Sequence, residues 1–352
     1  MIGLRAALAG LLALLLCACS QTPEPVLPGV AIEGRYAVEG GAVVFGYPGT
    51  RMVVETSGPV TFELESRGDL GALDYRVDDG PWERVDLARG PQTLSLGPAR
   101  LHRLEVVRRN EDWQGPLVVH SASTPLGFAP GTPELPDTKI LFIGDSITAG
   151  AGTDVAHEDA GLGKPLDNAR LAFPRVLAER LPAQVHQVAY GGRGALRDWR
   201  DNETGDTADD GQVVLNMDAY YSRAVPSLEA PWDARQWVPD AVVIGLGTND
   251  FNSGVPGGDS FVDAYLGLVE QVRADAPGIP ILILSSPMTG GDKGAAMRAQ
   301  LDAVAERAGK GVQRLDTGLY AGRPSVVGHP TDAQHVQIAN EIEPVLRAML
   351  GL

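Results

Sequence analysis

Hydrophobic and polar positions follow two different patterns along the chain, and the change lies near residue 137. From about residue 31 to residue 122, apolar and polar residues alternate in short runs separated by turn residues. Such alternation is typical of half-buried strands. The clearest predicted strands are 52–55, 60–64, 73–77, 83–87, 93–96 and 104–107. Asp78-Asp79-Gly80 indicates a hairpin turn. We expect residues 31–122 to form an all-β sandwich or jelly roll.

After a proline-rich linker at 123–137, residues 138–352 alternate between strand and helix patterns. The predicted strands are 140–143, 183–188, 241–246, 279–284 and 311–315, and the predicted helices are 168–181, 261–276, 292–308 and 331–350. This alternation predicts an α/β domain with a parallel sheet covered by helices on both faces. The segment 196–237 is polar and longer than an ordinary connection, so we expect it to form a wall or lid.

The bulk composition limits the class of protein. The 352 residues suggest two domains, and 44% hydrophobic residues suffice for real cores. A net charge of −16 argues against a nucleic-acid partner, because phosphate binding needs clustered Lys and Arg. The two cysteines, Cys17 and Cys19, leave the folded body with neither a disulfide framework nor a Cys-ligated zinc site.

The first residues predict export. The apolar run 6–16 follows a single Arg and is too short for a comfortable membrane span. Leu16-Cys17-Ala18-Cys19 resembles a bacterial lipobox, which implies a signal peptide at 1–19 and lipidation of Cys19. An ordinary cleaved signal peptide is the alternative. Lipoproteins retained in the inner membrane carry Asp after the lipidated cysteine, whereas this chain has Ser20, which is typical of outer-membrane lipoproteins. Residues 20–30 would then form a tether between the lipid and the folded body. We expect an exported protein that meets the membrane only through a lipid anchor, on the periplasmic or surface side.

The candidate chemistry begins at the end of the first strand of the second domain. The apolar run 140–143 stops at Gly144-Asp145-Ser146. A serine at the carboxyl end of a buried strand lies where open α/β sheets bind their ligands. Ser146 is therefore a candidate nucleophile, which requires a base and a set of oxyanion donors.

Histidine is the usual base, because its pKa lies near neutrality. Two of the six histidines fall in the β region, His186 lies within a predicted strand, and His157 lies in a loop. His329 precedes the last helix at His329-Pro330, so it can point into a cleft, whereas His335 lies inside that helix. We favour His329 as the base and keep His335 as the alternative.

Two further loops supply candidate oxyanion donors. Residues 190–194 (Tyr-Gly-Gly-Arg-Gly) follow the second strand, and 247–250 (Gly-Thr-Asn-Asp) follow the third. Backbone N–H groups at a glycine-rich turn and an Asn amide are suitable donors. Asp145, Asp198 and Asp250 are more simply read as residues that shape these turns.

The four blocks Gly144-Asp145-Ser146, Gly194, 247–250 and His329-Pro330 resemble, in order, those of the SGNH (GDSL-type) hydrolases. This resemblance implies a flavodoxin-like domain with a five-stranded parallel sheet. It also implies Ser146 as nucleophile, His329 as base, and an oxyanion hole made by the N–H groups of Ser146 and Gly194 and the side chain of Asn249.

The preceding β domain, with Gly34-Arg35, 47–50 and 108–111 (Arg-Arg-Asn-Glu), is similar to carbohydrate esterase family 2. That similarity implies a jelly roll joined to an SGNH domain, and an esterase that removes acetyl groups from carbohydrate, plant polysaccharides included. No cofactor or metal is needed. A lipase, thioesterase or lysophospholipase of the same fold is one alternative, since fold does not decide substrate. A polysaccharide-binding lipoprotein with an inactive esterase domain is another.

One position departs from the family pattern. Many SGNH hydrolases carry an Asp three residues before the catalytic histidine, and some family 2 esterases carry it two before, but these positions hold Val326 and Val327. A backbone carbonyl could orient the imidazole instead, giving a Ser-His dyad, or the acid could come from elsewhere; lost activity is a third reading. Asp332 is expected to cap the last helix. Trp199, Trp232 and Trp237 are open to two readings, sugar stacking or packing.

Overall fold

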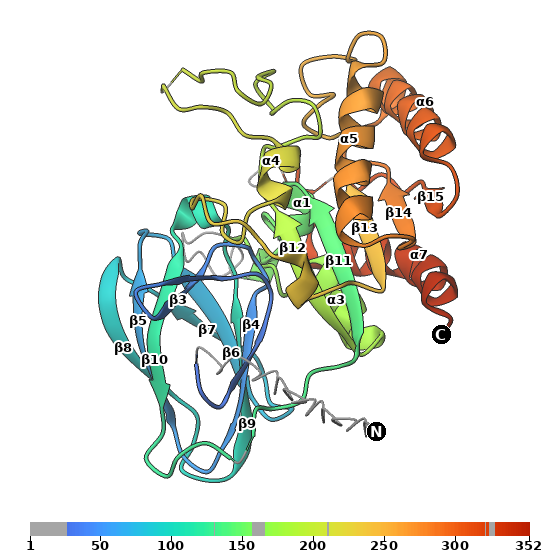
Figure 1. Ribbon diagram of the computed structural model, residues 1–352. Helices are drawn as coiled ribbons and strands as arrows, with labels where there is room; N and C mark the ends of the chain where they lie inside the picture. The colour runs from blue at the N-terminus through green and yellow to red at the C-terminus, as the bar shows by residue number, and fades with distance from the viewer. Residues whose placement is uncertain (1–26, 130, 157–165, 210, 321, 324–327) are drawn as a thin grey trace, which may run out of the picture.

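The computed structural model describes residues 27–129, 131–156, 166–209, 211–320, 322–323 and 328–352. Figure 1 shows two layered bodies, an N-terminal β sandwich and a C-terminal sheet flanked by helices. The predicted signal peptide, Cys19 and tether residues 20–26 lie outside the described residues, as do His157, Val326 and Val327.

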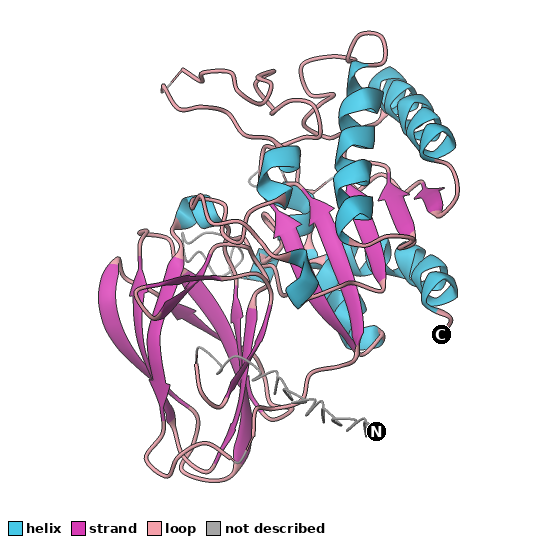
Figure 2. Cartoon of the chain, in the orientation of Figure 1, coloured by secondary structure: helices cyan, strands magenta, loops and turns pink. Residues whose placement is uncertain are grey.

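The N-terminal sandwich consists of two five-stranded antiparallel sheets (Figure 2). One sheet has the order β1 (Val30–Glu33), β4 (Arg51–Thr56), β9 (His102–Arg108), β6 (Ala72–Val77) and β7 (Glu83–Asp86). The other has the order β2 (Ala37–Glu39), β3 (Ala42–Phe45), β10 (Leu117–Ser123), β5 (Val60–Ser66) and β8 (Gly90–Leu96). Phe45, Phe62 and Leu104 are among the side chains that fill the space between the sheets. The predicted jelly-roll or sandwich architecture is confirmed.

The C-terminal sheet is parallel and has the order β12 (Ala183–Ala189), β11 (Thr138–Gly144), β13 (Ala241–Gly245), β14 (Ile281–Leu284) and β15 (Val312–Leu315). The first three strands along the chain thus have the spatial order second, first, third, as in flavodoxin-like folds, which confirms the predicted class. In such sheets ligands bind outside the carboxyl ends of the strands where the winding reverses, here at β11 and β13.

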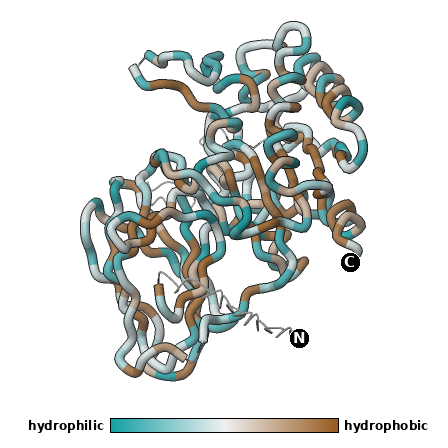
Figure 3. Tube along the Cα trace, in the orientation of Figure 1, coloured by the Kyte–Doolittle hydropathy of each residue, from teal (hydrophilic) through white to brown (hydrophobic). Residues whose placement is uncertain are grey.

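Helices cover both faces of this sheet. The helical elements are η1 (Asp112–Gln114), α1 (Ser146–Ala149), α3 (Phe173–Arg180), α4 (Met217–Tyr221), η2 (Ala234–Gln236), α5 (Ser260–Asp275), α6 (Gly291–Ala308) and α7 (Asp332–Leu350). Helices α3 and α7 pack together on one face, and α5 and α6 on the other. The central strands are the brown, apolar centre of this body in Figure 3.

The structure corrects several element predictions. The predicted helix 168–181 begins only at Phe173, because Pro174 fits the first helical turn and disfavours helix before it. Strands β1, β2, β3 and β10 were not predicted. Strand β3 is buried at every position, and β1 at all but one, so neither shows the alternation on which the strand prediction relied.

Buried polar contacts join the two bodies. Glu33 of β1 accepts hydrogen bonds from Arg51 and from the backbone N–H of Val185 on β12, and it forms an ion pair with Arg175 of α3. Arg109, which directly follows β9, forms ion pairs with Asp74 in its own domain and with Asp154 in the other. Because unpaired buried charges are strongly unfavourable, these pairs fix how the domains sit together.

Candidate active site

Ser146 lies where β11 ends and α1 begins. Gly144 is the last residue of β11, and a Cβ there would stand 2.0 Å from Thr148 Oγ1, so only glycine fits this turn. Asp145 is the N-cap of α1, and its carboxylate accepts the N–H of Ile147 at 2.9 Å. The turn therefore presents Ser146 at the N-terminal end of the helix, half-buried. The prediction that Asp145 shapes the turn is confirmed.

His329, from the C-terminal part of the same domain's sequence, lies against this serine. Its Nε2 atom lies 2.8 Å from Ser146 Oγ, although 183 residues separate them. This is the distance that a base needs in order to take the serine proton. The structure thus brings together the predicted nucleophile and the predicted base.

Backbone contacts on both sides of His329 hold it in place. Gly322 N donates to Gly328 O at 3.0 Å, and a Cβ at Gly322 would stand 1.5 Å from the carbonyl oxygen of His329. On the other side, Thr331 and Gln334 form a capping box at the start of α7. Asp332 is the first helical residue rather than the predicted cap, because the Thr331 hydroxyl already accepts the N–H of Gln334.

His335 has a structural role. It is fully buried in α7, and its Nδ1 accepts the backbone N–H of Phe173 at 3.2 Å. Burial, and next the charge of His329, lower the pKa of His335 to about 3, so it stays neutral at ordinary pH. The alternative base predicted from the sequence is therefore tied to helix packing and lies away from the serine contact.

Asn249 lies in the loop that follows β13 and contacts Asp145, the residue before the serine. Its side chain is 8% exposed, and its Nδ2 donates to Arg193 O at 2.9 Å and to Asp145 Oδ2 at 3.4 Å. The second contact is long for a hydrogen bond, so that N–H is the one that an oxyanion can recruit. Burial raises the pKa of Asp145 to about 7. Asn249 thus links the serine turn to the loop after β12.

The loop that carries Gly194 is built around the buried carboxylate of Asp250. Asp250 Oδ1 accepts the N–H groups of Leu196 and Arg197 at 2.7 and 3.1 Å, and Oδ2 accepts that of Ala195 at 3.2 Å. A Cβ at Gly194 would stand 2.3 Å from Asp250 Oδ2, which explains the glycine. The predicted turn-shaping role of Asp250 is confirmed, and the carboxylate fixes the backbone next to the predicted oxyanion donor.

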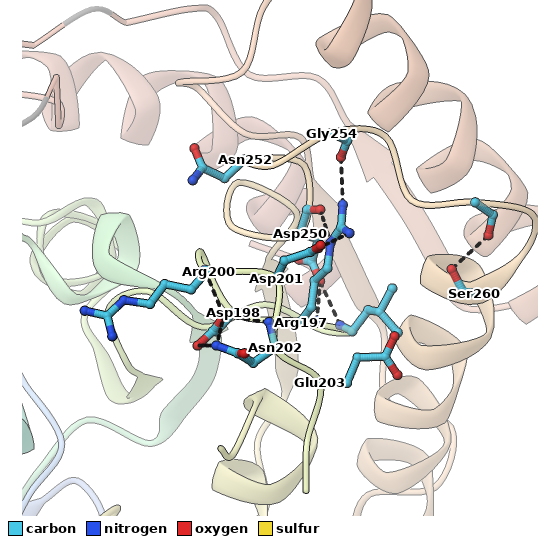
Figure 4. Close-up of polar contacts among 12 residues, drawn as sticks. Arg197, Asp198, Arg200, Asp201, Asn202, Glu203, Asp250, Asn252, Gly254 and Ser260 are labelled. Atoms are coloured by element: carbon cyan, nitrogen blue, oxygen red, sulfur yellow. Dashed lines mark hydrogen bonds and ion pairs between the residues drawn. The ribbon is translucent and has the colours of Figure 1, made fainter. Parts of the chain in front are cut away.

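The same loop continues through further polar contacts, drawn in Figure 4. Arg197 donates to Asp250 O at 2.7 Å and to Gly254 O at 2.8 Å, so it ties the loop after β12 to the loop after β13. Asp198 accepts the backbone N–H groups of Arg200 and Asn202, as expected of a turn residue. Arg200 points away from this cluster.

The β domain reaches the site through Glu111, whose role was not predicted. Its buried carboxyl group accepts the N–H of Gly191, and the Trp113 side chain interacts with it. Burial, reinforced by the charges of Asp167 and Asp145, raises the pKa of Glu111 to about 8. The sequence signal was the similarity of 108–111 to a family block, but the contact to a loop 80 residues away depends on how the domains pack.

The three candidate tryptophans differ in their surroundings. Trp237 is buried, with its ring stacked 3.6 Å from that of His186, and Trp232 packs against Arg35, whose guanidinium lies 5.2 Å from the ring. Trp199 is 49% exposed and lies against Gly192. Packing thus accounts for Trp232 and Trp237, and Trp199 alone of the three remains a candidate for substrate contact.

Two general findings concern metals and membranes. Across the described ranges, no three His, Cys, Asp or Glu side chains gather into a group that could hold a metal ion. Within the same part of the chain, every helix is too short or too polar to cross a bilayer.

The site can now be set beside known proteins. A model of the GDSL-like Lipase/Acylhydrolase family matches residues 142–335. An acetylxylan esterase / glucomannan deacetylase of Cellvibrio japonicus (strain Ueda107) is 31% identical over 339 residues, which cover 92% of this chain and 89% of the relative.

Two solved structures share the whole architecture. A family two carbohydrate esterase from Cellvibrio japonicus superimposes with a TM-score of 0.83 at 28% identity, covering 92% of this chain and 96% of that one. One from Clostridium thermocellum, solved in complex with cellohexaose, has a TM-score of 0.80 at 22% identity, covering 92% and 99%, which supports the fold alone. The chain therefore belongs to the GDSL-like lipase/acylhydrolase family, among the carbohydrate esterases of family 2, and is a carboxylic ester hydrolase.

Proposed function

We propose that this protein is a serine esterase that removes acetyl groups from polysaccharide or oligosaccharide through an acyl-enzyme on Ser146. The observation that carries the proposal is the 2.8 Å contact between Ser146 Oγ and His329 Nε2 at the carboxyl end of a parallel sheet. The choice of acetylated carbohydrate is supported by the relative named acetylxylan esterase / glucomannan deacetylase.

The proposed reaction has two steps. His329 takes the Ser146 proton as the hydroxyl oxygen attacks the ester carbonyl, and the same imidazole then protonates the departing sugar hydroxyl. The oxyanion accepts hydrogen bonds from the N–H groups of Ser146 and Gly194 and from Asn249 Nδ2, which gives up its long contact to Asp145. Water, activated by His329, then attacks the acetyl-serine and releases acetate.

Histidine variants test the assignment of the base. His329→Ala should lower kcat on a nitrophenyl acetate by about a thousandfold or more, because an unassisted serine is a poor nucleophile. His335→Ala should mainly destabilise the fold, since His335 holds the N–H of Phe173. A larger fall in kcat for the His335 variant, measured on folded protein, would reverse the assignment.

We further propose that a backbone carbonyl, rather than a carboxylate, orients His329, giving a Ser-His dyad. The support is the sequence, with valines at 326 and 327 where many SGNH hydrolases and some family 2 esterases carry an Asp. Asp332, the acid nearest to His329 in sequence on its carboxyl side, offers the test. Asp332→Asn should leave kcat within a few-fold of the parent, whereas a loss of about 10⁴ would identify Asp332 as the orienting group.

Acyl length separates this function from its nearest rival. Acetyl nitrophenyl ester should be turned over much faster than the long-chain ester, whereas turnover of the long chain only would favour a lipase. A parent protein that hydrolyses neither ester, yet is retained on polysaccharide, would instead be a binding lipoprotein.

We propose that Cys19 carries the lipid that anchors the exported protein to the outer membrane. The support is the lipobox-like sequence and the tether that follows it. Cys19→Ala should move the protein from the membrane fraction to the soluble fraction of cells, while Cys17→Ala should not. Unchanged membrane association of the Cys19 variant would contradict the anchor.

A further inference from the structure

An exposed tryptophan of the β domain lies two residues from Glu111, which contacts the loop that carries Gly194. Trp113, in η1, is 55% exposed, and among the described residues no aromatic ring or guanidinium stacks on its indole. An exposed indole leaves a large apolar face in water, which a binding partner commonly covers. Trp199 of the other domain is also exposed, but the guanidinium of Arg200 lies 4.6 Å from its ring centre.

Glu111 links Trp113 to the loop that leads to Gly194. The Trp113 side chain interacts with the Glu111 carboxyl group, which accepts the N–H of Gly191. Gly191 lies three residues before Gly194. Glu111 therefore connects an exposed aromatic side chain of one domain to the predicted oxyanion loop of the other.

Trp199 contacts Gly192, the residue that follows Gly191 in the same loop. Its backbone N–H donates to Gly192 O at 2.9 Å, and its Cδ1 lies 2.7 Å from where a Cβ of Gly192 would stand. Trp199 thus contacts Gly192 directly, whereas Trp113 is linked to the preceding glycine through Glu111.

We propose that Trp113 is a substrate-binding residue, which stacks on a sugar ring of the polysaccharide chain next to the acetylated sugar. The inference rests on the proposed function. Its chemistry is general: the C–H face of a pyranose is apolar, so it covers an indole favourably, while the ring hydroxyls remain in water. The β domain would thereby contribute directly to the substrate site.

The test compares a polymeric with a small substrate. Acetate release from acetylated xylan and acetylated glucomannan, and hydrolysis of nitrophenyl acetate, are measured for the parent, Trp113→Ala and Trp113→Phe. For the alanine variant, kcat/KM on the acetylated polymer should fall by about tenfold through a higher KM, while nitrophenyl acetate stays within about twofold. The phenylalanine variant, which keeps an aromatic face and loses the N–H, should recover most of the polymer activity.

Trp82→Ala is the matched control, because Trp82 is a β-domain tryptophan already stacked between Arg76 and Arg170. It should not change the ratio of polymer to small-ester activity. If Trp113→Ala lost activity equally on both substrates, or on neither, the inference would be overturned and the esterase assignment would still stand. A parent that releases no acetate from either polymer would overturn the proposed function and this inference together.

Discussion

Replacing Asp250 tests whether a buried carboxylate positions the oxyanion loop. Asp250 receives three backbone N–H groups from residues 195–197, at 2.7 to 3.2 Å. Asp250→Ala removes the acceptor of all three and leaves a space beside Gly194. Asp250→Asn keeps Oδ1, which accepts two of the three, and turns an amide donor toward the N–H of Ala195.

The hydrogen-bond geometry sets the expected magnitudes. A buried N–H left without an acceptor costs about 1 to 3 kcal/mol, so the alanine variant should lose roughly 3 to 6 kcal/mol of unfolding free energy once water and loop movement recover part of the cost. The asparagine variant, with one mismatched N–H, should lose about 1 to 3 kcal/mol. Since Gly194 loses its support, kcat of the alanine variant on nitrophenyl acetate should fall by about ten- to a hundredfold.

The assay pairs chemical denaturation with steady-state kinetics. Asp198→Ala is the control, because Asp198 is a buried turn residue of the same segment that accepts the N–H groups of Arg200 and Asn202. It should cost stability and leave kcat on the small ester close to that of the parent. A folded Asp250→Ala protein with parental kcat would refute the reasoning that this carboxylate prepares the oxyanion site.

Two further predictions concern the histidine loop and pH. Gly322→Ala should lower kcat at least tenfold, since a Cβ there would stand 1.5 Å from the His329 carbonyl oxygen. Gly257→Ala is the control: a Cβ at Gly257 would have no atom within 4 Å, so kcat should stay close to that of the parent. Equal kcat in the two variants would contradict this prediction. Burial raises the pKa of Glu111 from its ordinary 4.5 to about 8, so the native state keeps a proton that the unfolded state releases. The free energy of unfolding should therefore fall between about pH 4.5 and pH 8, by up to about 5 kcal/mol from this group. Glu111→Gln should weaken that fall in denaturation at pH 5 and pH 8, and an unchanged pH dependence would contradict it.

The sequence was sufficient to predict the architecture and the residues that meet at the serine. Ser146 and Asn249 follow apolar runs, and the ends of neighbouring parallel strands must meet at one edge. His329 was separated from His335 by its place before a helix rather than within it, and the 2.8 Å contact to Ser146 matches that choice. The catalytic roles themselves stay predictions.

The missed features depend on tertiary packing. Strands such as β3 are buried on both faces, so their composition carries no alternation. The link from Glu111 to Gly191 joins two domains, and neither residue has a local pattern that names the other. No sequence pattern distinguishes Trp113 from a packed tryptophan, because only its exposure beside that link sets it apart.

The most direct measurement is acetate release from acetylated polysaccharide by the parent and by Ser146→Ala. The parent should release acetate, and the variant, whose folding is checked by its denaturation curve, should retain less than about one thousandth of that rate. Parental acetate release by the Ser146 variant would contradict the account, because the reaction would then proceed without the proposed acyl-enzyme.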